Sequence, residues 1–165
     1  MVAAMGVDAL LKDGGVEYAK VRRRRARRRR GVGLGVDHAI PEEQIVKTLL
    51  LVDAGGYGLA VLPRNCHLDL NAVAAEFGRA FRVASKEEVL RLFPGLPPRA
   101  LPPVGGPGIE TFVDQSLVTL ADVYLETADS RRLVRVDGEA FRGLLYGAWC
   151  GRISEPGTKG ITRIA

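Results

Sequence analysis

Cysteine, histidine and aromatic residues are scarce in this 165-residue sequence, which has two cysteines, two histidines and 6% aromatic residues. Cys66 and Cys150 lie far apart, and neither belongs to a Cys-x-x-Cys pair or stands at metal-ligand spacing from His38 or His67. We therefore expect no disulfide, no metal site and no cofactor. Few aromatic residues also disfavour a general RNA-binding protein that stacks bases.

Long apolar segments are missing as well. No uninterrupted apolar stretch approaches the ~20 residues that a membrane span needs, and charged residues follow soon after the first six positions. We therefore expect no membrane association and no secretory signal, with the cytoplasm as the compartment. The balance of 47% hydrophobic and 26% charged residues is typical of a soluble globular protein, and the length suits one domain.

The positive net charge of +5 comes from one short segment. Eight arginines occupy residues 22–25 and 27–30, and without them the net charge would be −3. The basic character is therefore local, and the rest of the domain need not bind nucleic acid in general.

The chain alternates short strand-like and helix-like segments. A helix and an extended piece are expected over residues 7–19. Aliphatic runs at 45–52 and 57–62, separated by Gly55-Gly56, predict a hairpin. Ser85 and Glu88 have the spacing of a capping box at a helix start. The other expected elements are a helix ending at Gly78, strands at 81–84, 111–113, 123–125 and 133–136, and a helix at 139–145.

These elements predict an α/β (α+β) fold, a single domain with a mixed β-sheet flanked by short helices. We expect three regions: an N-terminal helix with an arginine-rich, partly irregular segment (1–39), the domain core (40–153) and a frayed tail (154–165). Residues 94–108 hold six prolines and four glycines, which predicts a stiff, shaped loop.

The order of several short motifs resembles the YbaK-like family, which includes the insertion domain of bacterial prolyl-tRNA synthetases and free-standing trans-editing deacylases. The most specific pair is Val-Lys-Thr-Leu at 46–49 followed by Pro-Pro-x-Gly at 102–105. The matching segments are 45–52, 56–57, 60–63, 67–70, 84–89, 100–105 and 113–117, within a resemblance that covers roughly residues 40–145. The resemblance implies that family's curved sheet.

The resemblance also implies an activity, which is hydrolysis of the ester between a mischarged amino acid and the terminal ribose of tRNA, in trans. The expected partners are the 3′ acceptor end of an aminoacyl-tRNA and an aminoacyl-tRNA synthetase. In this family the vicinal ribose hydroxyl is thought to help activate water. Backbone N–H groups of the proline-glycine loop would stabilise the oxyanion, a form of electrostatic preorganisation.

Lys47 is the first candidate catalytic residue. Spacing alone favours a lysine on the solvent face of a strand, because Val46 and Thr48 point the other way. The resemblance favours a lysine that projects into a cleft and holds the terminal phosphate or ribose of the substrate. It also assigns Thr48 to substrate binding.

The proline-rich loop supplies the other expected catalytic groups, Pro103, Val104 and Gly105. By composition alone such a loop merely covers a sheet, whereas its two prolines could also fix the Val104 and Gly105 amides toward a substrate. Further expected substrate contacts are Tyr18, Arg99, Ala100, Leu101, Pro102, Asp114 and Ser116. For three of these a structural role remains open: Tyr18 as core, Asp114 as a loop brace and Ser116 as a turn cap.

Two positions depart from the family pattern in the core. Relatives usually carry glycine where Arg99 stands, and a Gly-x-His turn where this chain has Ala128-Asp129-Ser130. The second departure removes a histidine that could position water or substrate. The sequence therefore leaves an alternative function open, a degenerate non-catalytic module that binds tRNA or a synthetase.

The arginine run and the glycines after it replace a histidine-containing strand end and an alanine-rich helix of the family. Three interpretations remain: a solvated segment without a dedicated role, an arm that binds tRNA phosphates, or a reading-frame shift in an alanine-rich helix, whose GCC codons read as CGC arginine codons.

Overall fold

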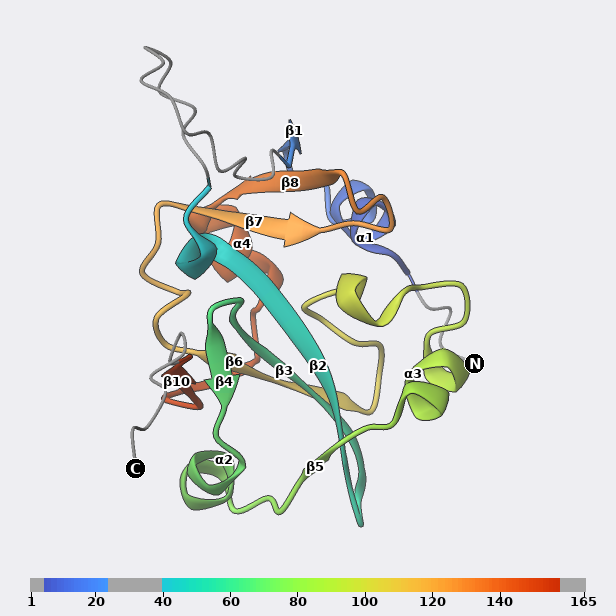
Figure 1. The fold of residues 1–165 in the computed structure, drawn as a ribbon, viewed down its shortest axis with the longest axis vertical. Helices are drawn as coiled ribbons and strands as arrows, with labels where there is room; N and C mark the ends of the chain where they lie inside the picture. Colours follow the sequence, from blue (N-terminus) through green and yellow to red (C-terminus); the bar gives the residue numbers. More distant parts are fainter. Residues whose placement is uncertain (1–4, 24–39, 158–165) are drawn as a thin grey trace, which may run out of the picture.

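The computed structural model describes residues 5–23 and 40–157, and Figure 1 shows how the elements are arranged. Most of the arginine run and the glycines that follow it lie outside the described residues. The helices are α1 (Val7–Asp13), α2 (Leu70–Phe77), α3 (Lys86–Leu92), α4 (Gly138–Leu144) and the 3₁₀ turns η1 (Glu42–Gln44) and η2 (Pro98–Ala100). The strands are β1 (Tyr18–Arg22), β2 (Ile45–Asp53), β3 (Gly56–Pro63), β4 (Cys66–Leu68), β5 (Arg82–Val83), β6 (Ile109–Asp114), β7 (Asp122–Glu126), β8 (Arg132–Asp137), β9 (Trp149–Gly151) and β10 (Ser154–Pro156).

One mixed sheet organises the domain. Its strand order is β1-β8-β7-β2-β3-β6-β9, with β5 also paired to β2. Strands β2 and β7, β3 and β6, and β6 and β9 run parallel, whereas the other pairs in this sheet are antiparallel. A second, two-stranded sheet joins β10 to β4. The expected α/β domain with a mixed sheet and short helices is confirmed.

The local signals in the sequence explain the hairpin and the helix ends. Strands β2 and β3 pair from Val46–Pro63 to Asp53–Gly56, and Asp53 Oδ1 accepts a hydrogen bond from the Gly55 amide across the turn. The capping box at α3 is formed, because Ser85 Oγ accepts from the Glu88 amide and the Glu88 carboxylate accepts from the Ser85 amide. The predicted hairpin and helix start are therefore confirmed.

The core is divided between the faces of the sheet. Helix α2 packs on one face of the β2–β3 hairpin, where Val73 meets Leu51 and Leu62. Helix α3 packs on the opposite face, where Val89 meets Leu50 and Leu59. A third cluster joins α1 and α4 to β7 and β8, and Figure 1 shows these helices near those strands. Within the described ranges each helix is too short to traverse a lipid bilayer.

The terminal segments are more ordered than the sequence suggested. The expectation of a frayed tail from residue 154 is wrong for Ser154–Pro156, because this segment pairs with Cys66–Leu68. Residues 158–165 lie outside the described residues. The described part of the N-terminal region belongs to the core, since Leu11 is fully buried and β1 pairs with β8 along its whole length. These strand partners lie about 90 and 110 residues away in the chain, so local patterns could not reveal them.

Close packing at the start of α4 leads to a first prediction. A Cβ added at Gly138 would lie 2.0 Å from the Leu120 carbonyl oxygen, whereas a Cβ at Gly143 in the same helix would meet nothing within 4 Å. Gly138→Ala should therefore lower the free energy of unfolding by about 1–3 kcal/mol. Gly143→Ala, the matched control, should be neutral or stabilise by up to ~1 kcal/mol, because alanine favours a helix more than glycine does.

Urea denaturation of both variants measures these changes. Equal stability of the Gly138→Ala and Gly143→Ala proteins would contradict the tight approach of α4 to residue 120.

Candidate functional site

Strand β2 pairs with β3 along one edge. Along its other edge it pairs with two different strands, one near each end. Strand β7 pairs with β2 only at Ile45 and Val46, and β5 pairs with it only at Leu51 and Val52. The Ala84 amide extends the second contact by donating to the Leu50 carbonyl. No described strand pairs with residues 47–49 on this side. We call this stretch the open edge of β2.

Lys47 is the first residue of the open edge. It is half-buried, and its Nζ donates a hydrogen bond to the Cys66 carbonyl oxygen at 2.7 Å. Burial lowers the pKa of Lys47, an effect that the nearby Cys66 thiol partly opposes. An ammonium group has three donors, and no described carboxylate lies within ion-pair distance of this one. Lys47 thus presents a partly desolvated cation with donor capacity for a further ligand.

Thr48 reaches the open edge through its backbone. Its side chain is buried on the face opposite to Lys47, as strand alternation requires. Backbone groups of alternate residues point to the same edge of a strand. Because the Leu50 carbonyl faces Ala84, the amide and carbonyl of Thr48 also face the open edge. These groups need hydrogen-bond partners, which water or a ligand can supply.

The proline-rich loop contains η2, which contacts both β2 and β7. Ala100, Leu101, Pro102 and Pro103 are all buried. Leu101 packs with Leu50 and Leu59. The loop is therefore held against the sheet from within, on the face of β2 opposite to the Lys47 side chain.

The next two loop residues leave the buried layer. Val104 packs against the core cluster that joins α1 and α4 to β7 and β8. Gly105 lies so close to Ile109 that a Cβ added at Gly105 would be 2.7 Å from the Ile109 side chain. Neither the Val104 nor the Gly105 amide donates a hydrogen bond to any residue in the described ranges. Val104 lines a hollow with Tyr146 and Trp149, so the role expected of these amides stays a prediction.

Arg99 stands where relatives usually carry glycine, and it contacts Ala128 in the segment that replaces their Gly-x-His turn. Its Nη1 donates to the Thr127 carbonyl at 2.7 Å and its Nη2 to the Ala128 carbonyl at 2.6 Å. Both carbonyls belong to the turn after β7, where that strand has already left β2. The planar guanidinium bridges the two carbonyls and ties η2 to this turn. The side chain therefore acts here as a clamp between the loop and the β7–β8 turn.

Asp114 organises the end of β6. Its Oδ1 accepts hydrogen bonds from the Ser116 amide and hydroxyl at 3.0 and 2.6 Å. Its Oδ2 accepts from the Ile153 amide and the Ser154 hydroxyl at 3.1 and 2.8 Å. Burial by itself raises the pKa of Asp114, but these hydrogen bonds outweigh it and lower the pKa overall. Asp114 and Ser116 thus brace the junction between β6 and the C-terminal strands.

Tyr18 lies away from the open edge. It stands opposite Val136 in the β1–β8 pair, and two strands separate β1 from β2 in the sheet. Its ring is partly buried against the cluster that holds Val136 and Leu11. The structure therefore brings η2, with Arg99, to the region where β2 carries Lys47 and Thr48 and parts from β7. Val104 lies apart from Lys47, in a hollow that it shares with Tyr146 and Trp149. Asp114 and Ser116 lie at the end of β6. The Cys66 carbonyl, a partner of Lys47, was missed because a backbone acceptor leaves no residue-type signal.

Comparisons with known proteins identify the family and the fold. The family described as "Aminoacyl-tRNA editing domain" matches residues 34–144. This chain therefore belongs to the aminoacyl-tRNA editing domain family, and the resemblance seen in the sequence is confirmed. No curated protein sequence matches the chain.

Solved structures share the fold. The crystal structure of hypothetical protein APE2540 superposes with a TM-score of 0.70 at 26% identity, covering 90% of this chain and 99% of that one. A candidate trans-editing enzyme for prolyl-tRNA synthetase gives 0.60 at 29% identity, covering 70% and 73%. A candidate signal transduction protein from Marinobacter aquaeolei VT8 gives 0.70 at 25% identity, covering 90% of this chain but 30% of the other.

The Asp114 hydrogen bonds predict how stability depends on pH. A lowered pKa in the folded state contributes stability that is complete above the unfolded value, near 3.8, and is lost as pH falls through the folded pKa. Asp114→Asn should cost about 1–3 kcal/mol at neutral pH, because an amide nitrogen replaces one of the two acceptors.

Urea midpoints of wild type and Asp114→Asn should therefore differ most at pH 7 and converge below pH 4. A difference that stays constant between pH 7 and pH 3 would show that the charge of Asp114 is not what stabilises this junction.

The Arg99 clamp gives a separate prediction. Arg99→Ala should lower the free energy of unfolding by about 1–2 kcal/mol, a figure reduced for the exposure of this side chain. Arg91→Ala on α3 is the matched control, because Arg91 is also exposed and donates no hydrogen bond within the described residues. Thermal melting compares the two, and equal midpoints would exclude a clamp of this kind.

Proposed function

We propose that this protein hydrolyses the ester between a mischarged amino acid and the terminal ribose of a tRNA, acting in trans. Membership of the aminoacyl-tRNA editing domain family supports this proposal, as does the likeness to a candidate trans-editing enzyme for prolyl-tRNA synthetase. The substrate is then an aminoacyl-tRNA, and a synthetase that makes the error is a second expected partner. The reaction belongs to translation in the cytoplasm.

The observation that carries the proposal is the position of Lys47. It stands where β7 leaves β2, half-buried, with one described hydrogen bond to the Cys66 carbonyl. Beside it are the backbone groups of Thr48, whereas the loop that follows η2 packs on the opposite face of β2. A ligand placed along the open edge can touch a cation and backbone donors at once. The Lys47 ammonium would hold the terminal phosphate or a ribose oxygen.

In the proposed reaction, water attacks the carbonyl carbon of the aminoacyl ester. The carbon–oxygen bond to the ribose breaks, the ribose oxygen takes up a proton, and the free amino acid leaves. Negative charge develops on the carbonyl oxygen during attack. The Val104 and Gly105 amides are the donors available to stabilise this charge, and the rigid loop keeps them oriented before the substrate arrives. Ala100, Leu101 and Pro102 would shape the space for the amino acid.

A second function remains a candidate because of Arg99. Its guanidinium fills the region between η2 and the β7–β8 turn, where relatives usually carry glycine and a Gly-x-His turn. A chain in which the clamp closes the amino-acid pocket would keep RNA or synthetase binding and lose hydrolysis. Such a non-catalytic module would bind a charged tRNA and leave its ester intact.

Replacing Lys47 tests the first function. Lys47→Met retains the buried stem and removes the charge, so it should lower kcat/KM for deacylation by roughly 100-fold or more. Lys47→Arg should recover only part of the activity, because a planar fork does not replace a compact ammonium. The measurement is release of radiolabelled amino acid over a panel of mischarged tRNAs.

Lys86→Met, on the exposed first turn of α3, serves as the matched control and should keep wild-type activity. Thermal melting should show little change for Lys47→Met, since the methionine stem keeps the packing. Activity retained in Lys47→Met would remove Lys47 from the mechanism. A wild type that is inactive on every tRNA but binds them would favour the non-catalytic module.

A further inference from the structure

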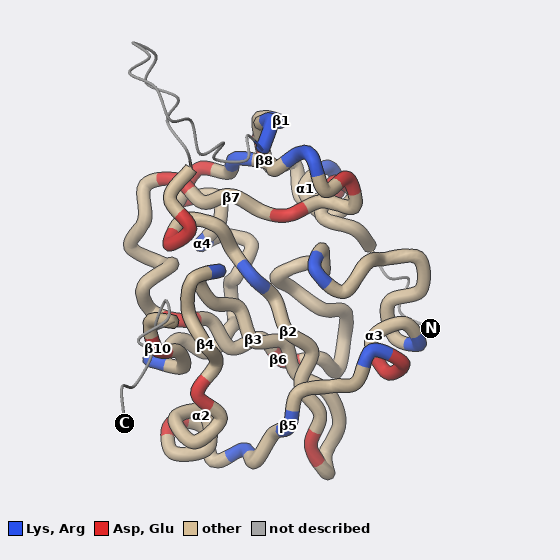
Figure 2. Tube along the Cα trace, in the orientation of Figure 1, with Lys and Arg blue, Asp and Glu red and all other residues tan. Residues whose placement is uncertain are grey.

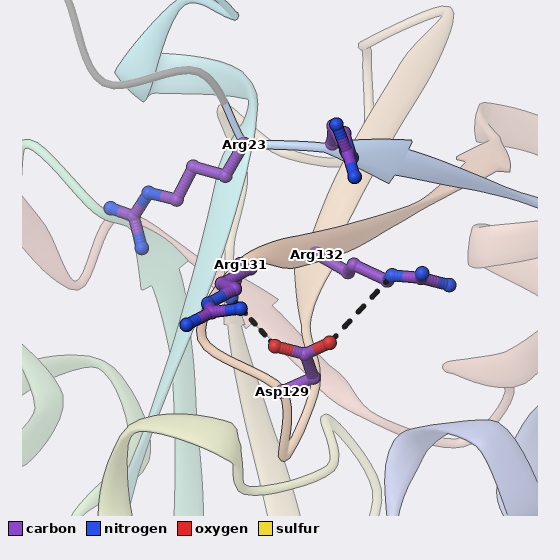
Figure 3. A pocket seen from close by; sticks show the side chains of 5 residues that line it. Arg23, Asp129, Arg131 and Arg132 are labelled. Atoms are coloured by element: carbon purple, nitrogen blue, oxygen red, sulfur yellow. Dashed lines mark hydrogen bonds and ion pairs between the residues drawn. The ribbon is translucent and has the colours of Figure 1, made fainter.

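A second cluster of cations lies outside the site described so far. Five arginines line two adjoining hollows of ≈ 380 and ≈ 480 Å³, which share Arg23 and Arg131. We call this surface the arginine hollow. Figure 2 shows basic segments along β1 and β8. Figure 3 shows side chains that line the first of these hollows, with Arg23, Asp129, Arg131 and Arg132 labelled. Its arginines are Arg22, Arg23, Arg64, Arg131 and Arg132.

Strand pairing brings these distant residues together. Arg22 stands opposite Arg132 in the β1–β8 pair, and the Arg23 amide donates to the Arg131 carbonyl at 2.8 Å. Arg64 comes from the β3–β4 turn, where its amide donates to the Ile45 carbonyl at 2.8 Å. The backbone therefore fixes the arginines on three segments, so their convergence does not depend on flexible side chains alone.

The charges of this cluster are only partly balanced. Glu126 Oε1 accepts hydrogen bonds from Arg23 Nη1 at 3.0 Å and from Arg64 Nη1 at 2.8 Å. Asp129 Oδ2 lies 3.6 Å from Arg132 Nε. Two described carboxylates thus face five guanidinium groups. Like charges held together in this way repel one another, and an anion in the hollow would relieve the repulsion. Guanidinium groups match the geometry of phosphate oxygens, to which they donate in pairs.

Two segments of the chain connect the arginine hollow to the candidate site. Arg64 lies two residues before Cys66 in the chain. The Cys66 carbonyl accepts a hydrogen bond from Lys47. The turn that presents Arg131 follows Ala128, whose carbonyl accepts from Arg99. An extended polyanion that ends at the open edge of β2 would therefore cross the arginine hollow on its way there.

We propose that the arginine hollow binds consecutive phosphates of the single-stranded 3′ end of an RNA and directs that end to Lys47. The proposal rests on the proposed function for the orientation of the RNA. An RNA fits better than an acidic protein because two hollows share their central arginines, which suits a repeating anion. Arg23, Arg64 and Arg131 are the residues expected to contact phosphate.

Binding of a deacylated RNA minihelix ending in CCA tests the proposal without requiring hydrolysis. Fluorescence anisotropy should show a Kd raised roughly three- to tenfold by Arg64→Ala and by Arg131→Ala. Each arginine–phosphate pair that a variant removes should reduce the slope of log affinity against log salt by roughly 0.7–0.9. Arg91→Ala is the matched control and should change neither quantity. Unchanged affinity in both hollow variants would overturn the proposal.

Glu126→Gln provides a second test, because it should strengthen RNA binding and misfolding would not do so. Removing this carboxylate frees Arg23 and Arg64 for phosphate, so RNA affinity should rise at least about twofold. Weakened or unchanged RNA binding in this variant would count against the proposal.

The outcomes also separate this proposal from the proposed function. Hydrolysis by the wild type, with normal RNA binding in the arginine variants, would refute the arginine hollow alone. Loss of RNA binding in those variants, together with an inactive wild type, would refute the proposed hydrolysis alone. Arginine-dependent binding of polyglutamate without any binding of the minihelix would point to an acidic protein and overturn the RNA assignment.

Discussion

Strand β2 keeps a continuous partner along only one edge, and the candidate site depends on how the other edge is shared. Strand β3 covers the first edge from Val46 to Asp53, whereas β7 and β5 each take only one end of the second. The backbone groups of an unpaired sheet edge require hydrogen-bond partners, which another segment, water or a ligand can supply. The divergence of β7 thus creates both the open edge and the space that η2 occupies.

Several features of the surrounding structure support this divergence. Arg99 satisfies the carbonyls of Thr127 and Ala128 just after β7, where strand pairing with β2 has ended. Asp114 joins β6 to the C-terminal segment through two hydrogen bonds, from the Ile153 amide and the Ser154 hydroxyl. Both sets of hydrogen bonds connect segments that are distant in sequence, and they hold the walls of the site in place before a substrate binds. Preorganisation of this kind is what electrostatic stabilisation of an oxyanion requires.

Local chemistry in the sequence predicted much of the fold. The Gly55-Gly56 turn, the Ser85–Glu88 capping box and the stiff proline-rich loop each depend on residues close together in the chain. The strands β4, β9 and β10 were missed because three-residue strands carry almost no periodic signal. Their existence depends on pairing between distant segments, such as Ser154 with Leu68.

Only those candidate site residues that belong to local motifs could be picked out from the sequence. Lys47 and residues 100–105 stood out by motif, but nothing in the sequence indicated that Arg99 would reach Thr127 and Ala128. The sequence assigned Arg99 to substrate contact, and only the fold shows that its side chain bridges to the turn after β7. The arginine hollow was hidden because Arg64 and Arg131 are 67 residues apart and converge only through strand pairing.

The most direct test of the central claim is an NMR titration of ¹⁵N-labelled protein with a non-hydrolysable 3′-aminoacylamido-adenosine. A ligand at the open edge of β2 should shift the amide signals of Thr48, Val104 and Gly105 and the side-chain signals of Lys47. Lys47→Met should weaken the titration while leaving the rest of the spectrum unchanged. A titration that leaves the signals of residues 47–49 and of the Lys47 side chain unshifted would contradict this account of the site.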